Sequence, residues 1–183
     1  MKRSELEHII RAAGTIAGEA PIVVIGSQAI LGQFPEASGL LARSAEADIF
    51  PLDRPERSDL IEGAMGEGSR FHEEYGYYAR GVDEYTAILP AGWRDRLIRI
   101  ENANTGGNVG LCLEVHDLAI SKYIAGREKD LEFTAVLARH AMTHIATLAE
   151  RLTLTNHAAL TPPRRQIVEA HIRRDFDRKG KAT

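Results

Sequence analysis

The sequence lacks most of the features that would place a protein outside the ordinary globular class. Its 183 residues contain one cysteine, Cys112, which lies in an apolar run and has no partner for an internal disulfide. A chain of this kind is typical of a reducing environment, so we expect a cytoplasmic protein. It also contains no internal repeat and no low-complexity segment.

Long hydrophobic runs are absent as well. No segment approaches the roughly 20 apolar residues that a membrane-spanning helix needs. The first residues, Met1 to Glu5, lead into an amphipathic pattern with acids and not into the apolar core of a signal peptide. We therefore expect no membrane partner.

Neither sign of charge is in large excess, since the formal net charge is -3. Bulk charge therefore predicts no polyanion partner. The distribution is uneven, however: residues 164–181 hold seven Lys or Arg against three acids. This basic segment is a candidate contact for RNA, although basic ends are also common as solubilising surface.

The order of strand-like and helix-like segments predicts an α+β chain, with a mixed central sheet flanked by helices and a helical C-terminal half. Pro21 to Ile25 is a β-branched run typical of a buried central strand, and residues 45–50 form a second strand candidate. Residues 96–101 and 111–115 resemble the two arms of a hairpin. The pattern then predicts a helix capped by Asp117 and one long helix over residues 128–150.

Two carboxylates on the second strand are the first candidates for chemistry. Residues i and i+2 of a strand share a face, so Glu46 and Asp48 project together, about 7 Å apart along the chain. Paired carboxylates repel one another, and a divalent cation removes that conflict. The simpler alternative is a solvated sheet edge.

A turn before this strand adds a second candidate. Gly26-Ser27 follows the buried strand and precedes a short helical segment, an arrangement that presents backbone N–H groups and a hydroxyl to an anion. The segment lacks the Gly-Lys-Ser/Thr ending of a Walker motif and the G-x-G-x-x-G dinucleotide pattern. Taken alone, it could be an ordinary strand-to-helix turn.

Together, the strand, the Gly-Ser turn, the short helix and the acid-x-acid strand resemble a known core motif. Ile22 to Phe50 is similar to the core of the polymerase-beta-like minimal nucleotidyltransferase superfamily. The resemblance implies that Gly26 and Ser27 bind the triphosphate and that Glu46 and Asp48 bind Mg²⁺ (or Mn²⁺). The usual pair in that superfamily is two aspartates, and Glu46 departs from it.

A second block resembles a narrower group. Asp117 to Asp130 is similar to a helix of the abortive-infection-type toxin nucleotidyltransferases, and the whole chain looks closest to uncharacterised bacterial proteins. The resemblance implies that Lys122 contacts nucleotide phosphates and that Asp130 completes the catalytic site. It gives Arg127 a phosphate or an orienting role. The alternative is ordinary ion pairing on a helix surface.

A third carboxylate is expected beside the metal, and Glu114 and Glu101 are the candidates.

Residues 1–115 would then form the nucleotidyltransferase core, and residues 116–183 a helical region packed on it. We expect transfer of a nucleoside monophosphate from an NTP to an acceptor hydroxyl, with tRNA as a toxin-like acceptor and an antitoxin as partner. The alternative is a weakly active or inactive binding module that acts through a protein or RNA partner.

Overall fold

The computed structural model describes residues 1–18 and 21–179, which divide into two compact units. The first unit comprises Met1–Thr86 and Arg96–Glu114. The second comprises Ala87–Asp95 and the described residues from Val115 onward.

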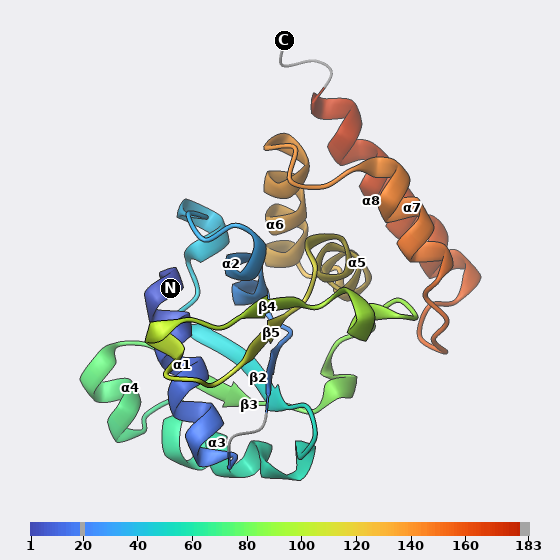
Figure 1. Ribbon diagram of the computed structural model, residues 1–183. Coiled ribbons are helices and arrows are strands. Elements are labelled where there is room, and N and C mark those ends of the chain that lie inside the picture. The colour runs from blue at the N-terminus through green and yellow to red at the C-terminus, as the bar shows by residue number, and fades with distance from the viewer. Residues whose placement is uncertain (19–20, 180–183) are drawn as a thin grey trace. The chain divides into compact units, whose positions relative to one another are not determined.

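The first unit is built on a mixed five-stranded sheet with the strand order β3-β2-β1-β5-β4 (Figure 1). Its strands are β1 (Ile22–Val24), β2 (Glu46–Pro51), β3 (Tyr78–Gly81), β4 (Ile98–Ile100) and β5 (Gly110–Cys112). β1 is antiparallel to β2 and parallel to β5, and β2 is parallel to β3. This architecture confirms the predicted α+β class with a mixed sheet.

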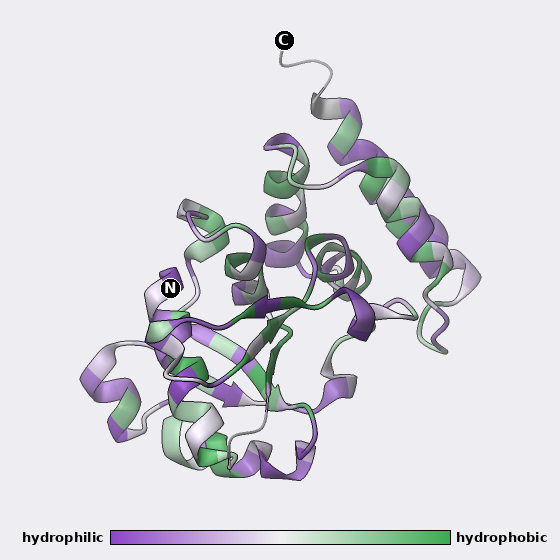
Figure 2. Cartoon of the chain, viewed as in Figure 1, coloured by the Kyte–Doolittle hydropathy of each residue, from purple (hydrophilic) through white to green (hydrophobic). Residues whose placement is uncertain are grey.

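The centre of the sheet is the most hydrophobic part of it. All three residues of β1 are fully buried, as expected for a β-branched strand with neighbours on both sides. Figure 2 shows the hydrophobic colouring of this strand against the mixed colouring of the helices. The predicted hairpin pair is also confirmed, since β4 and β5 are antiparallel.

Three helices, α1 (Arg3–Ile16), α2 (Ile30–Gln33) and α3 (Ser58–Met65), pack on one face of this sheet. A Cβ on Gly32 of α2 would lie 3.0 Å from the sulfur of Cys112, and one on Gly81 would lie 2.8 Å from the backbone carbon of Ser58. Cys112 and Gly81 share a face with Ile49, because register partners project to the same side. Glu46 and Asp48 alternate with Ile49 and therefore project to the opposite face.

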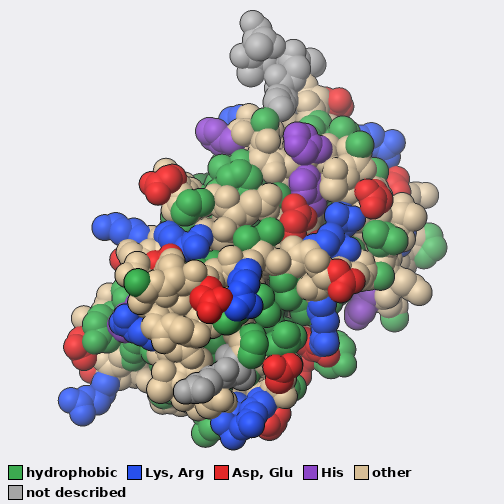
Figure 3. Space-filling view, in the orientation of Figure 1, with side chains coloured by type: hydrophobic (Ala, Val, Ile, Leu, Met, Phe, Trp, Pro, Cys, Tyr) green, Lys and Arg blue, Asp and Glu red, His purple; other side chains and the backbone are tan. Residues whose placement is uncertain are grey.

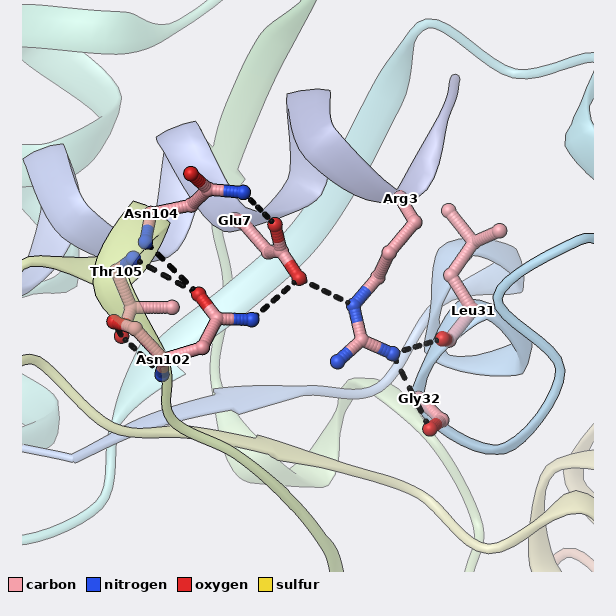
Figure 4. Close-up of polar contacts among 7 residues, drawn as sticks. All are labelled: Arg3, Glu7, Leu31, Gly32, Asn102, Asn104 and Thr105. Carbon is pink, nitrogen blue, oxygen red and sulfur yellow. Dashed lines mark hydrogen bonds and ion pairs between the residues drawn. The ribbon is translucent and has the colours of Figure 1, made fainter.

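A buried carboxylate fastens α1 to the rest of the first unit (Figure 4). Glu7 is 5% exposed and accepts hydrogen bonds from Arg3 Nε, Asn102 Nδ2 and Asn104 Nδ2, each at 2.8 Å. Arg3 also donates to the carbonyl of Leu31, at 2.6 Å. The pair thus connects α2, which follows the Gly26-Ser27 turn, with the link between β4 and β5.

We expect Glu7→Gln to lower the free energy of unfolding by about 2–3 kcal/mol, because three donors lose a charged acceptor in a buried place. Burial raises the pKa of Glu7, but the bonds from Asn104, Asn102 and Arg3 and the charge of Arg3 outweigh it, so the pKa lies below its usual value. A depressed folded-state pKa stabilises the protein above the unfolded-state pKa, and that contribution is lost as the pH falls through the folded-state value. The difference between wild type and variant should therefore be largest near neutral pH.

Chemical denaturation at pH 7 and at a pH below 4 measures this difference. The control is Glu73→Gln, which makes the same change at an exposed position of α4 (Arg70–Tyr75) and should leave stability within about 0.5 kcal/mol. Equal stability losses for the two variants would contradict the role assigned to Glu7.

The described part of the second unit is mainly helical and contains α5 (Val115–Ala125), α6 (Glu128–Arg139), α7 (Ile145–Thr153) and α8 (Pro162–Lys179). The prediction of one helix over residues 128–150 is wrong, because the chain turns between α6 and α7 at Ala141, whose φ is +56°. The backbone N–H of His144 in this turn donates to His116 Nε2 of α5 at 3.0 Å. α5 begins at Val115, so Asp117 is not its N-cap residue but lies buried in the first turn.

Over residues 1–18 and 21–179, no helix is long and apolar enough to cross a membrane.

Candidate functional site

The two carboxylates predicted to hold a metal lie on one face of β2. Glu46 and Asp48 are half-buried, and they alternate with Ala47 and Ile49, which are fully buried on the other face. The sheet core therefore holds the strand in place, while its polar face stays partly accessible to solvent.

The Gly26-Ser27 turn lies directly against Asp48. The backbone N–H of Ile25 donates to the carbonyl of Asp48 at 3.0 Å, and the chain then turns at Gly26 into a 3₁₀ segment (Ser27–Ala29). A Cβ on Gly26 would overlap the Asp48 carboxylate, lying 2.9 Å from its Cγ and 3.0 Å from its Cβ. The φ of Gly26 is -79°, so close approach and not a left-handed backbone calls for glycine here.

The sheet topology separates the two candidates for a third carboxylate. Glu114 follows β5, which is parallel to β1, and Leu113 N–H donates to the Val24 carbonyl at 3.1 Å. Glu114 therefore lies at the end of the strands where the Gly26 turn begins. Glu101 follows β4, which runs antiparallel to β5, so it lies at the opposite end of the strands and is not a neighbour of the turn. It is exposed and binds Arg99.

The donor set offers Mg²⁺ two carboxylates and leaves its other coordination positions to water and substrate phosphates. In the described ranges, no group of three or more His, Cys, Asp or Glu side chains is placed to hold a metal ion. Mg²⁺ is nevertheless commonly bound by one or two carboxylates, with substrate phosphates and water completing its coordination. Two carboxylates beside the turn that is predicted to bind phosphate match that requirement.

This site also contains a tyrosine, which the sequence did not identify. Tyr78 of β3 pairs in register with Glu46, and its hydroxyl donates to Glu46 Oε2 at 2.9 Å. Burial, together with the hydrogen bond and charge of Glu46, raises the pKa of Tyr78 to about 12. Its hydroxyl therefore stays protonated and donates across the ordinary pH range. Only strand register could have revealed this pairing.

The second motif forms a compact ionic cluster within the second unit. Asp130 is 1% exposed and accepts from Arg127 Nε at 2.6 Å and from Lys122 Nζ at 3.2 Å. The ammonium of Lys122 also lies 4.7 Å from the centre of the Phe133 ring, a cation–π distance. Burial raises the pKa of Asp130, but the hydrogen bond of Arg127 and the charge of Lys122 outweigh this effect, and the pKa is lowered. The structure thus brings the three predicted residues of this block together.

Several cations of the basic segment serve structure within the second unit. Arg164 donates to the carbonyl of Ile124 at 2.8 Å, and Arg165 donates to that of Leu152 at 2.7 Å. Arg174 pairs with Asp175, and Lys181 lies outside the described residues. On the face drawn in Figure 3, basic and acidic side chains are interspersed. An RNA contact through this segment stays a prediction.

Comparison with known proteins adds one match. A family described as "Nucleotidyltransferase of unknown function (DUF6036)" matches residues 4–156, which is most of the chain. Searches of curated proteins and of solved structures found no match.

Proposed function

The chain belongs to the family of nucleotidyltransferases of unknown function (DUF6036), and on that premise we propose that it transfers a nucleoside monophosphate from an NTP to an acceptor hydroxyl. The acceptor oxygen forms a bond to the α-phosphorus, and the bond from that phosphorus to the bridging oxygen breaks. Pyrophosphate leaves with the electron pair of the broken bond.

The packing of the Asp48 carboxylate against Gly26 is the observation that carries this proposal. It supports a site in which phosphate and carboxylates meet at one edge of the sheet. A cation between them would neutralise both, as phosphoryl transfer requires. A solvated sheet edge needs no such close approach.

Each residue of the first unit then has a role. Glu46 and Asp48 hold Mg²⁺ or Mn²⁺, and Gly26 and Ser27 bind the β- and γ-phosphates through backbone N–H groups and the Ser27 hydroxyl. When bound, the metal supplies positive charge that activates the acceptor oxygen and neutralises the leaving pyrophosphate. Glu114 is the proposed third carboxylate, which receives the proton of the acceptor hydroxyl; among the described residues it forms no three-carboxylate cluster with Glu46 and Asp48.

The roles of the second motif rest on the family resemblance. We propose that Lys122 and Arg127 supply positive charge to nucleotide phosphates and that Asp130 keeps the two cations oriented. The distances of 3.2 Å and 2.6 Å from Asp130 to these cations support the orienting role. A toxin-like reaction on tRNA, with an antitoxin as partner, remains the narrower hypothesis.

Nucleotide binding and transfer are tested together. We expect one of the four NTPs, added with Mg²⁺ or Mn²⁺ at about 100 times its Kd, to stabilise the protein by about 2.7 kcal/mol. This corresponds to a rise of roughly 5–10 °C in Tm for a chain of this size. The same NTP, labelled at the α-phosphate, should transfer label to cellular RNA, protein or a small molecule and release pyrophosphate.

Two negative results separate the alternatives. A thermal shift without label transfer or pyrophosphate release would favour a binding module that has lost its chemistry. No shift with any NTP, together with identical behaviour of Asp48→Ala, would reject the enzyme.

A further inference from the structure

The hydrogen bond between Tyr78 and Glu46 is a product of the sheet itself. Parallel pairing of β2 and β3 sets the two residues side by side, and the hydroxyl lies 2.9 Å from Glu46 Oε2. Both side chains are half-buried. The bond therefore joins neighbouring positions of two ordered strands, unlike a contact between flexible surface side chains.

This bond restrains the Glu46 side chain, which is longer than that of an aspartate. Glutamate has one more rotatable bond than aspartate, so its carboxylate loses more conformational freedom when it binds a cation. A donor that holds Oε2 reduces that freedom before the cation arrives. The carboxylate keeps further lone pairs, on Oε1 above all, for a metal.

The tyrosine is itself held in place from the other side. The ring of His72 on α4 lies 4.6 Å from the ring of Tyr78, centre to centre. His72 Nδ1 in turn accepts the backbone N–H of Gly68 at 3.0 Å. The phenol is thus fixed by α4 and the turn before it, which lets it orient a partner.

We propose that Tyr78 is a positioning residue that orients the Glu46 carboxylate for binding of the divalent cation. This inference rests on the proposed function, because it assumes that Glu46 is a metal ligand. It also makes Glu46 and Tyr78 a coupled pair, since an aspartate at position 46 would be one methylene too short to keep the bond.

Mn²⁺ alone is the probe, and the electron paramagnetic resonance signal of the free ion measures binding without any turnover. We expect Tyr78→Phe to weaken Mn²⁺ binding by roughly 10-fold, the lower end of what loss of a residue supporting a metal ligand causes. Tyr77→Phe is the matched control. It removes a hydroxyl that hydrogen-bonds to His8 at 2.7 Å, and it should bind Mn²⁺ like wild type.

A double-mutant cycle shows whether the effect runs through Glu46. In a Glu46→Asp background, Tyr78→Phe should cause little further loss, because the bond is already absent. Raising the Mn²⁺ concentration should restore turnover of Tyr78→Phe, which a general loss of structure would not allow. Circular dichroism and thermal melting of each variant check the fold.

The outcomes distinguish the two proposals. If wild type binds Mn²⁺, Asp48→Asn does not, and Tyr78→Phe binds as tightly as wild type or more tightly, the role of Tyr78 is refuted and the proposed function stands. If wild type and Asp48→Asn are equally unable to bind Mn²⁺, even with NTP present, the proposed function fails and the role of Tyr78 fails with it.

Discussion

Asp48→Asn should reduce nucleotidyl transfer by at least about 100-fold while leaving the protein folded. Loss of a residue that merely supports a metal ligand costs 10–100-fold in affinity or activity, so loss of the ligand charge itself should cost more. Asparagine has nearly the same shape, and Asp48 is only half-buried. Relief of repulsion with Glu46 should leave the Tm unchanged or slightly raised.

Turnover at saturating NTP and metal, measured beside thermal unfolding, tests this expectation. Asp53→Asn is the matched control, because it makes the same change at an exposed position just past the end of β2. It should retain wild-type activity. Unfolding of Asp48→Asn would instead mark Asp48 as a structural residue and would remove the basis for the metal site.

Gly26→Ala should reduce activity by about 10–100-fold through displacement of Asp48. The new methyl group would lie 3.0 Å from Asp48 Cβ and would overlap the carboxylate beyond it. The carboxylate can move, but Cβ belongs to a strand fixed by pairing on both sides. Steric overlap of this kind commonly costs 1–3 kcal/mol of stability, so a modest decrease in Tm should accompany the loss.

The control for this substitution is Gly63→Ala. Gly63 lies within α3, has ordinary helical backbone, and a Cβ there would meet nothing within 4 Å. Alanine in a helix is favoured over glycine by up to about 1 kcal/mol, so this variant should keep full activity and gain stability. Wild-type Mn²⁺ binding and turnover in Gly26→Ala would contradict the close contact on which the proposed site depends.

Local patterns in the sequence were sufficient to predict the strand at the centre of the sheet and the polar face of β2. A β-branched run became the buried β1, and period-two alternation put Glu46 and Asp48 on one side of the strand and Ala47 on the other. The nucleotidyltransferase family is confirmed by the family match, whereas nearness to the abortive-infection toxins stays a prediction.

Features that depend on distant residues were not predictable in this way. The turn between α6 and α7 contains no glycine or proline. One of its backbone N–H groups, that of His144, donates a hydrogen bond to His116 of α5. The pairing of Tyr78 with Glu46 joins residues 32 positions apart. Likewise, strand direction alone distinguished Glu114 from Glu101.

The sequence by itself determined that β1, β2, β4 and β5 are strands, and it determined the paired carboxylates and the glycine turn, because each depends on near neighbours along the chain. Only the tertiary structure decided which groups meet, such as the Asp48 carboxylate and Gly26, or Tyr78 and Glu46. The reason is physical: side-chain periodicity is a local property, whereas strand order and register are set by burial and hydrogen bonding across the whole unit.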